Sequence, residues 1–496
     1  MSSPEPPRLS SFVSDVLKLV GGTAFAQALA VSASPILTRL YDPEAFGVAA
    51  LFTAIIGVIG GVACLRYHMA IMLPKRDKEA ANLLGLSLFL AAFMSILLIP
   101  IIWVCQEPML RLLNAPDLAP FIWLASPAVF LSGAFLALNY WNSRTKRYSR
   151  LSIARINASI CSTGTQIGAG IAGYPTGGSI IGAGIIGSAV STVVLGGQIW
   201  RDDNKIFRDG IRFDGMRDGL GRYRKFPLID TISTLLNAVS WQIPVFLLSA
   251  FFSASVVGLY ALCTRVLQLP MSFIGSSISQ VFFQRAAEAK AEGTLPSLVE
   301  NVFKVLVVLG LFPMLMLTLM GQNLFVIIFG IAWSEAGVYA QILGLWTFLW
   351  FISSPLSTIY IVLEKQEFGL KYNLANIVTR FISIGIGGWL GDPRISIFLF
   401  AISGLFVYSY LLQAILRFSG VSITRAMRIV FSNIKIFIPT GVIIVTLKEL
   451  SIDPLIQVIV SAMLTAIYYI FIIKTDPLIR TILIGPITCG SRPFMR

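Results

Sequence analysis

The chain has 496 residues, of which 56% are hydrophobic and only 12% are charged, and its mean hydropathy is +0.80. A soluble core cannot absorb this much apolar sequence, so the composition excludes a soluble globular protein and indicates a polytopic membrane protein. The net charge is +14, but the basic residues are spread between apolar segments, which argues against a nucleic-acid-binding surface.

The amino-terminal residues 1–16 are polar and rich in proline, and no small-residue cleavage site follows a short apolar core. We therefore expect no signal peptide and a first apolar segment that remains as a helix. Crossing a hydrocarbon core of ~30 Å takes about 20 apolar residues, and this criterion predicts an all-α protein with about fourteen transmembrane helices. In chain order, the predicted helices cover residues 17–38, 46–66, 82–104, 119–141, 151–172, 177–200, 227–251, 255–283, 301–321, 338–362, 369–390, 395–417, 429–447 and 454–473.

One long polar stretch, residues 201–226, divides the predicted helices. It carries eight basic residues and five aspartates and separates six helices from six. We therefore expect two six-helix lobes, 17–200 and 227–418, followed by two further helices within 429–473 and a tail over 474–496. In a second region, 321–338, we expect Leu324–Ile331 to form a short re-entrant or interfacial segment outside the fourteen helices.

A weak internal repeat supports the two-lobe organisation. Residues Leu40–Leu51 align with Phe251–Leu262, and Gly47 then matches Gly258. Together with the six-plus-six layout, this alignment favours two parallel repeats related by an axis along the membrane normal.

The basic residues predict the orientation of the chain. With the amino terminus in the cytoplasm, four of the 38 basic residues fall in external turns and three inside helices, and the remaining 31 are cytoplasmic. This asymmetry fits the positive-inside rule and places both termini in the cytoplasm. The external residues are Arg39, Arg111, Arg394 and Lys448, and those inside helices are Arg155, Arg265 and Arg380.

Glycines concentrate on the predicted helices 151–172 and 177–200. Gly164 and Gly168 form one GxxxG pair, and Gly178 and Gly182 form another. Such pairs allow close helix packing in lipid, which we consider more plausible here than a functional hinge.

Metal and disulfide chemistry is not expected. The five cysteines fall singly in different segments, and His68 is the only histidine. No metal-ligand spacing results, so we expect no metal site, no disulfide and no cofactor. We interpret His68 as a structural residue at a helix end rather than a pH switch.

Four predicted helices carry polar stripes, each confined to one helical face. A stripe of this kind is what a helix that lines a wet cavity needs, and a lone membrane anchor has no use for it. The stripes are Thr23, Gln27, Ser34 and Thr38; Asp230, Thr234, Asn237 and Trp241; Arg265, Gln268, Ser272, Ser276 and Ser279; and Asn373, Asn376, Arg380, Ser383 and Gly387.

Arginines are the strongest candidates for a binding role. An arginine in hydrocarbon costs about 2.5 kcal/mol or more and therefore faces a bundle interior or a wet cavity. Arg265 and Arg380 have no acidic residue one helical turn away, so their cavity would suit an anionic ligand. Arg39 and Arg66 lie near helix ends, where snorkelling is an equally simple explanation, and Arg265 could also lie near a helix end and snorkel. Asp230 is a candidate cation-coupling residue.

Enzyme signatures are absent from the sequence. It contains no GxxxxGK[ST], no HExxH and no nucleophile elbow. We therefore expect a transporter and keep two alternatives open. A cation-coupled multidrug exporter would favour an acidic cavity, and a polytopic glycan polymerase or ligase would need a large external loop.

The stretch over residues 18–90 resembles a known family. Lys18-Leu-Val-Gly-Gly-Thr-Ala24, Pro35-Ile-Leu-Thr-Arg-Leu-Tyr-Asp-Pro-Glu-Ala-Phe-Gly47, Cys64-Leu-Arg-Tyr67 and Leu73-Pro74 look like the start of Wzx-type flippases, also described as lipopolysaccharide biosynthesis proteins. The resemblance implies the fold of the multidrug/oligosaccharidyl-lipid/polysaccharide exporters, two six-helix lobes in a V around a central cavity, often with two extra helices.

The resemblance also implies a function and partners. The family moves undecaprenyl-pyrophosphate-linked oligosaccharide, such as an O-antigen or exopolysaccharide repeat unit, from the cytoplasmic to the periplasmic leaflet of the bacterial inner membrane. Cavity arginines are thought to bind the pyrophosphate, and Arg39 and Arg66 match that pattern. We expect Arg265 and Arg380 to do the same, and Gln27, Asn237 and Asn376 to meet sugar hydroxyls. The expected partners are this lipid-linked oligosaccharide and membrane lipids, with a polysaccharide polymerase and a chain-length regulator as further candidates. We expect the protein to act as a monomer.

Overall fold

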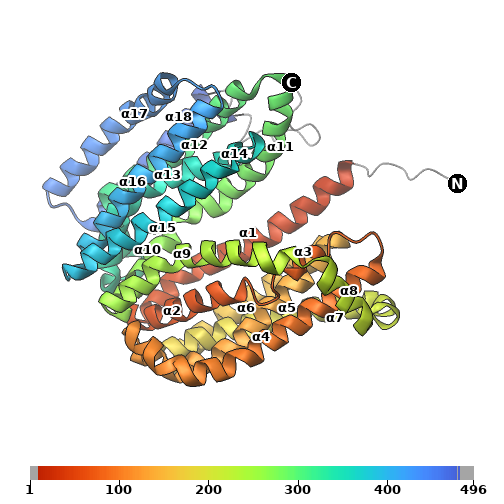
Figure 1. The fold of residues 1–496 in the computed structure, drawn as a ribbon. Helices are drawn as coiled ribbons and strands as arrows, with labels where there is room; N and C mark the ends of the chain where they lie inside the picture. The colour runs from red at the N-terminus through yellow and green to blue at the C-terminus, as the bar shows by residue number, and fades with distance from the viewer. Residues whose placement is uncertain (1–8, 477–478, 481–496) are drawn as a thin grey trace. The chain divides into compact units, whose positions relative to one another are not determined.

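The computed structural model describes residues 9–476 and 479–480, and the regular structure of this part of the chain is helical, without strands (Figure 1). Its contacts form two compact units, the first ending at Ala261 and the second beginning at Leu262. The helices of the first unit are α1 (Leu9–Leu40), α2 (Pro43–Gly60), α3 (Tyr67–Ala70), α4 (Asp77–Leu112), α5 (Ala125–Arg144), α6 (Tyr148–Ile171), α7 (Gly177–Gly210), α8 (Phe213–Arg222) and α9 (Thr231–Phe251).

Helix α10 (Ala254–Leu267) begins in the first unit and ends in the second. The second unit then contains α11 (Ser276–Glu292), α12 (Leu295–Phe329), α13 (Ser334–Leu356), α14 (Ile359–Val362), α15 (Gln366–Trp389), α16 (Pro393–Phe418), α17 (Ile423–Glu449) and α18 (Pro454–Thr475).

The all-α membrane fold is confirmed. Ten helical segments of the described chain are long and apolar enough to cross a membrane, so the protein is a multi-pass membrane protein. Each predicted segment coincides with one helix or with helices separated by a break. The number of about fourteen crossings stays a prediction, as do the lobe boundaries, which rest on chain order alone.

Three helices begin with the same local signal, an aspartate followed by proline. Asp42, Asp392 and Asp453 accept hydrogen bonds from backbone N–H groups in the first turns of α2, α16 and α18. Proline then occupies the first helical position, where no intrahelical hydrogen bond is lost. The Asp42-Pro43 pair therefore fixes the turn between α1 and α2, the stretch that carries the family resemblance.

Breaks in three predicted helices have visible causes. The predicted helix 46–66 ends at Gly60, and Leu65 and Arg66 both adopt positive φ before α3 begins. In the predicted helix 255–283, α10 ends at Leu267 and a short π-helical segment follows Pro270. In the predicted helix 338–362, α13 ends at Leu356, one residue after Pro355. Proline lacks the N–H that a continuous helix would need.

The polar stretch 201–226 is mostly helical rather than a loop. Helix α7 continues to Gly210, and α8 packs on α4. The Asn82 side chain ties the two ends of this connection, because its amide donates to Gly210 O at 2.8 Å and accepts from Arg212 N at 2.7 Å. The hydroxyl of Tyr67 donates to Leu220 O at 2.9 Å, so this stretch is docked on the first unit.

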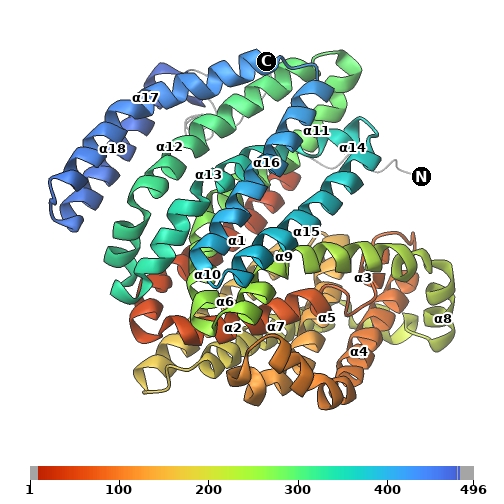
Figure 2. The same ribbon diagram turned by 60° about the vertical axis from the view of Figure 1, so that its left-hand side comes forward.

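In the second unit, α12 and α13 pack against each other, and α17 and α18 both lie along α12 (Figure 2). The rings of Phe312 and Tyr468 stack at 4.1 Å, and the Tyr468 hydroxyl donates to Val308 O at 2.9 Å. Helix α12 runs through to Phe329. Residues 324–329, which the sequence predicts as part of a separate re-entrant or interfacial segment, therefore belong to the end of α12.

The glycines divide into two groups when each is tested for the space that a Cβ would occupy. A Cβ on Gly164, Gly168 or Gly182 would meet no atom within 4 Å. In contrast, a Cβ on Gly47 would lie 1.7 Å from Ala254 O, and one on Gly258 would lie 1.8 Å from Pro43 O. The pair that the repeat aligned therefore makes a reciprocal close helix contact within the first unit, whereas Gly164–Gly168 does not.

Candidate functional site

The structure joins two of the predicted site residues in one ion pair. The Nε of Arg66 donates to Oδ2 of Asp230 at 2.7 Å, and its Nη2 lies 2.8 Å from the Met69 sulfur. Arg66 precedes α3, with φ of 64°, and Asp230 precedes α9. The side chains are 20% and 40% exposed, so the pair is formed but still accessible.

His68 lies beside this pair and is buried. Its side chain is only 1% exposed, and neither ring nitrogen has a hydrogen-bond partner among the described residues. The ring centroid lies 5.1 Å from that of Tyr140. Burial, reinforced by the positive charge of Arg66, lowers the pKa of His68 to about 4, while Asp230 acts in the opposite direction. His68 is therefore neutral at pH 7.

The polar stripe of α1 faces α6 in part. Thr23 accepts a hydrogen bond from Nη1 of Arg155 at 2.6 Å, and Ser159 donates to Ala26 O at 2.9 Å. Gln27 is half-buried. The polar stripe of α1 therefore contacts Arg155, which is half-buried. The sequence places Arg155 inside a helix, but it is not among the predicted site residues.

The other two predicted site residues of the first unit are exposed. Arg39 lies in the last turn of α1, and its Nη1 donates to Pro35 O at 2.9 Å, as expected for a cation at a helix carboxyl end. Asn237 lies on α9, two turns after Asp230. The structure does not bring either residue into the Arg66–Asp230 pair.

The stripe of α15 is buried within the second unit, except for Asn373, which is exposed. Arg380 and Asn376 are 2% and 7% exposed, and both donate to the Tyr408 hydroxyl, at 3.2 and 3.5 Å. The ring of Tyr408 also packs edge-on against those of Tyr372 and Trp346. These contacts hold Arg380 between α13, α15 and α16.

Arg265 differs from Arg380 in its exposure. It lies in the last turn of α10, where its side chain is exposed. Of the two predicted site arginines of the second unit, Arg265 is therefore the exposed one and Arg380 the buried one.

The chemistry of these groups is that of anion recognition. A guanidinium presents a planar fork of N–H donors that matches phosphate oxygens. Among the described residues, no group of three or more histidine, cysteine, aspartate or glutamate side chains could hold a metal ion. The accessible pair Arg66–Asp230 is the part of the site in which a ligand anion could replace a protein carboxylate.

Comparison with solved structures establishes the fold. The lipid II flippase MurJ in an inward closed conformation matches with a TM-score of 0.71 and 13% identity over 95% of this chain and 99% of that chain. An inward-facing multidrug resistance MATE family transporter of the MOP superfamily matches with a TM-score of 0.64 and 16% identity over 79% and 95%. A MATE in complex with MaL6 gives 0.53 and 12% over 82% and 95%.

These structural neighbours are flippases and transporters rather than enzymes. A comparison with curated protein sequences gave no match. The family comparison, in contrast, covers most of the chain. The model for "Polysaccharide biosynthesis protein" matches residues 36–338, and the chain therefore belongs to the polysaccharide biosynthesis protein family.

Proposed function

We propose that the protein is a flippase for undecaprenyl-pyrophosphate-linked oligosaccharide, an O-antigen or exopolysaccharide repeat unit. It would act in the bacterial inner membrane, with both termini in the cytoplasm, and move its substrate to the periplasmic leaflet. The family membership and the fold shared with a lipid II flippase support this proposal. The accessible Arg66–Asp230 ion pair is the single observation that carries it.

The physical problem is the passage of a charged headgroup through hydrocarbon. Burying an ion without a partner costs tens of kcal/mol in the ideal limit. A cavity that offers guanidinium groups and polar side chains replaces the lost hydration. An interior-negative membrane potential adds about 2.3 kcal/mol per charge per 100 mV in favour of outward movement of an anion.

Arg66 is the best-supported phosphate ligand of the set. Its guanidinium already binds one carboxylate oxygen in a partly exposed position. A pyrophosphate could take the place of the Asp230 carboxylate without a new arginine being desolvated. Asp230 would then be released from Arg66. Asp230 would thus control the access of an anion to Arg66, and this role explains the presence of Asp230 more directly than binding of a coupling cation does.

The remaining predicted residues extend this proposal. Exposed Arg265 and Arg39 are candidates for further phosphate contacts. Arg380 is enclosed, so its participation requires a conformation in which Tyr408 releases it, that is, a rearrangement of α15 against α16 within the second unit. We further propose that Gln27, Asn237 and Asn376 meet sugar hydroxyls.

The proposed partners follow from the function. The substrate and the surrounding membrane lipids are the direct ones, and a polysaccharide polymerase and a chain-length regulator would receive the product. We expect a functional monomer, because each lobe of such a transporter contributes to one central pathway.

A multidrug exporter is the second candidate, because the fold is also that of MATE transporters. Such an exporter needs an accessible acid for its cation, and Asp230 is the acid nearest to a polar stripe. In the structure, Arg66 already neutralises Asp230. This pairing favours an anionic substrate.

The test is export of polysaccharide in a strain that depends on this protein. We expect Arg66→Ala to abolish surface polysaccharide and to accumulate lipid-linked oligosaccharide in the cytoplasmic leaflet, and Arg265→Ala to reduce export. Arg111→Ala is the matched control, because Arg111 is 79% exposed and pairs with Glu107 on its own helix. Normal export by Arg66→Ala at normal protein abundance would contradict the proposal.

A further inference from the structure

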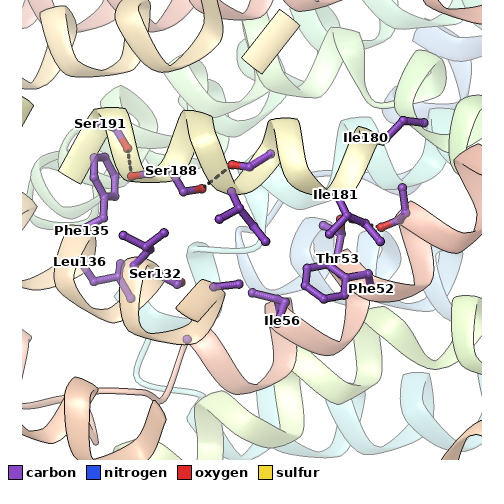
Figure 3. A pocket seen from close by; sticks show the side chains of 16 residues that line it. Phe52, Thr53, Ile56, Ser132, Phe135, Leu136, Ile180, Ile181, Ser188 and Ser191 are labelled. Carbon is purple, nitrogen blue, oxygen red and sulfur yellow. Dashed lines mark hydrogen bonds between the residues drawn. The ribbon is translucent and has the colours of Figure 1, made fainter. Parts of the chain in front are cut away.

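The first unit contains a pocket that is separate from the arginine site. It lies between α2, α5 and α7 and has a volume of about 570 Å³ (Figure 3). Each of these helices belongs to a segment that is long and apolar enough to cross the membrane. The volume falls within the range of pockets that hold small molecules. Because these helices are expected to span the membrane, we expect the pocket to lie within the hydrocarbon core.

The lining is mostly apolar and uncharged. None of the residues that line it carries an ionisable side chain. Its inner wall is formed by buried Ala49, Phe52, Ala128 and Ile181. A phosphate, a cation or any other charged group would find no partner here, which excludes the charged part of a lipid-linked substrate as the occupant.

The few hydroxyl groups of the lining do not make it a sugar site. Thr53 donates to Ala49 O at 2.8 Å, Ser188 to Gly184 O at 2.9 Å, and Ser191 to Ser188 O at 2.9 Å. These bonds to the helix's own carbonyl groups are common for serine and threonine in membrane helices. Three of the four lining hydroxyls therefore already donate within their own helix, and Ser132 is the fourth. The pocket thus offers a ligand mainly hydrocarbon contact, with one further hydroxyl.

The shape of the pocket is elongated. Its lining on α7 runs from Ile180 to Ser191, which corresponds to roughly 16 Å at 1.5 Å per residue. The volume spread over this length gives a cross-section of roughly 35 Å². A trough of these proportions accommodates a single extended chain.

We propose that this pocket binds one hydrocarbon chain of a membrane lipid. A prenyl chain of a lipid-linked oligosaccharide and an acyl chain of a phospholipid share this chemistry. Assignment to the prenyl chain rests on the proposed flippase function, whereas binding of an acyl chain does not. In either case, the pocket in the first unit would contact a hydrocarbon chain of the lipid, which the arginine site does not contact.

Gly184 gives a way to fill the pocket without disturbing its walls. It lines the pocket, and a Cβ on it would meet no atom within 4 Å. Gly182 lies on the same helix and also has no atom within 4 Å of its Cβ position, but it does not line the pocket. Gly184→Leu and Gly182→Leu are therefore a matched pair that differ in the face of α7 on which the new side chain lies.

The experiment is photolabelling of the purified full chain in phosphatidylethanolamine/phosphatidylglycerol vesicles. One arm contains polyprenyl phosphate with a diazirine in its chain, and the other contains phosphatidylglycerol with a diazirine in an acyl chain. We expect labels on Phe52 and Ile181, both 4% exposed, in the wild type and in Gly182→Leu. Gly184→Leu should lower these labels at least threefold while labelling of Ile186 and Val193, exposed on the outside of α7, remains unchanged.

The two arms identify the chain. Labelling by the prenyl probe assigns the pocket to the lipid carrier, and labelling by the phospholipid probe alone assigns it to an acyl chain. Absence of label on Phe52 and Ile181 with both probes, or equal labelling of the two glycine variants, would overturn the proposal. Labelling needs no transport, so this outcome is distinguishable from a failure of the flippase function in the Arg66→Ala test.

Discussion

Arg66 and Asp230 are 164 residues apart in the chain, yet Nε of Arg66 donates to Oδ2 of Asp230 at 2.7 Å. In the sequence each residue is a candidate on its own, Arg66 as a phosphate ligand and Asp230 as a cation-coupling acid. Their pairing unites these assignments, because a carboxylate that holds an arginine competes with any anion that the arginine would bind. The pair can have one of two roles. It is either a purely structural ion pair, or an anion-binding site in which the Asp230 carboxylate occupies Arg66 until a ligand replaces it.

Charge reversal separates these roles. In Arg66→Asp/Asp230→Arg the ion pair is retained with its partners exchanged. We expect this double variant to reach normal abundance but to remain defective in polysaccharide export, because the guanidinium then lies on the other element. Restored export, measured as surface polysaccharide per cell, would show that the ion pair has a structural role only. The partly exposed pair contributes at most about 1 kcal/mol to folding, so Asp230→Asn should change the abundance little.

The glycine contact between α2 and α10 predicts a defect in stability. Gly47→Ala places a methyl group 1.7 Å from Ala254 O, and Gly258→Ala places one 1.8 Å from Pro43 O. Since backbone cannot rotate away as a side chain can, we expect each variant to lose about 1–3 kcal/mol or more. Thermal unfolding in detergent would measure the loss.

Gly168→Ala is the control for these variants, because its Cβ would meet no atom within 4 Å. Removal of a glycine from a helix interior gains roughly 0.5–1 kcal/mol, so this variant should be as stable as the wild type or slightly more so. A loss of stability as large as that of Gly47→Ala would show that the contact explanation is wrong.

Local signals made much of the fold predictable. The Asp-Pro pairs fix where α2, α16 and α18 begin, and the apolar runs give the order of the helices. The same kind of reasoning could not predict which glycines lie at close contacts. Gly164 and Gly168 match a packing motif but face open space, whereas Gly47 and Gly258 match no motif and touch backbone, because the contact depends on a helix far along the chain.

Individual residues of the candidate site could be predicted from the sequence, but the contacts between them could not. Polar stripes identified Arg380 and Asn376, but no sequence signal shows that both donate to Tyr408. Arg155 was missed because its partner, Thr23, belongs to the stripe of another helix. A search for intramembrane arginines opposite a neighbouring polar stripe would have found it.

Tyr408 is predicted to hold the buried Arg380 in the second unit. Tyr408→Phe removes a hydroxyl that accepts from both Arg380 and Asn376, and a charged donor that loses an acceptor in a buried site costs about 1–3 kcal/mol. We expect the melting temperature in detergent to fall by several degrees. Tyr410→Phe, at an exposed neighbouring position, should melt like the wild type, and equal melting temperatures for both variants would refute a structural role of the Tyr408 hydroxyl.

His68 predicts an acid-dependent loss of stability. Its pKa is about 4 in the folded chain and about 6.5 when unfolded, so the unfolded state binds the proton more readily between these values. Stability is then complete above about pH 6.5 and falls as the pH decreases towards 4, by about 3 kcal/mol in total. The groups that act on the ring are Arg66 and Asp230 in the ion pair and Tyr140 on α5.

Two variants separate the titration of His68 from its burial. His68→Phe keeps an aromatic ring against Tyr140 and removes both unpartnered nitrogens, so it should be at least as stable as the wild type at pH 7 and lose less stability at pH 4.5. His68→Gln leaves a buried polar group that cannot titrate in this range, so its unfolding temperature should be lower at both pH values but change less between them. If the wild type and both variants lose the same stability between pH 7 and 4.5, the acid sensitivity belongs to other groups, because only the wild type retains a histidine at this position.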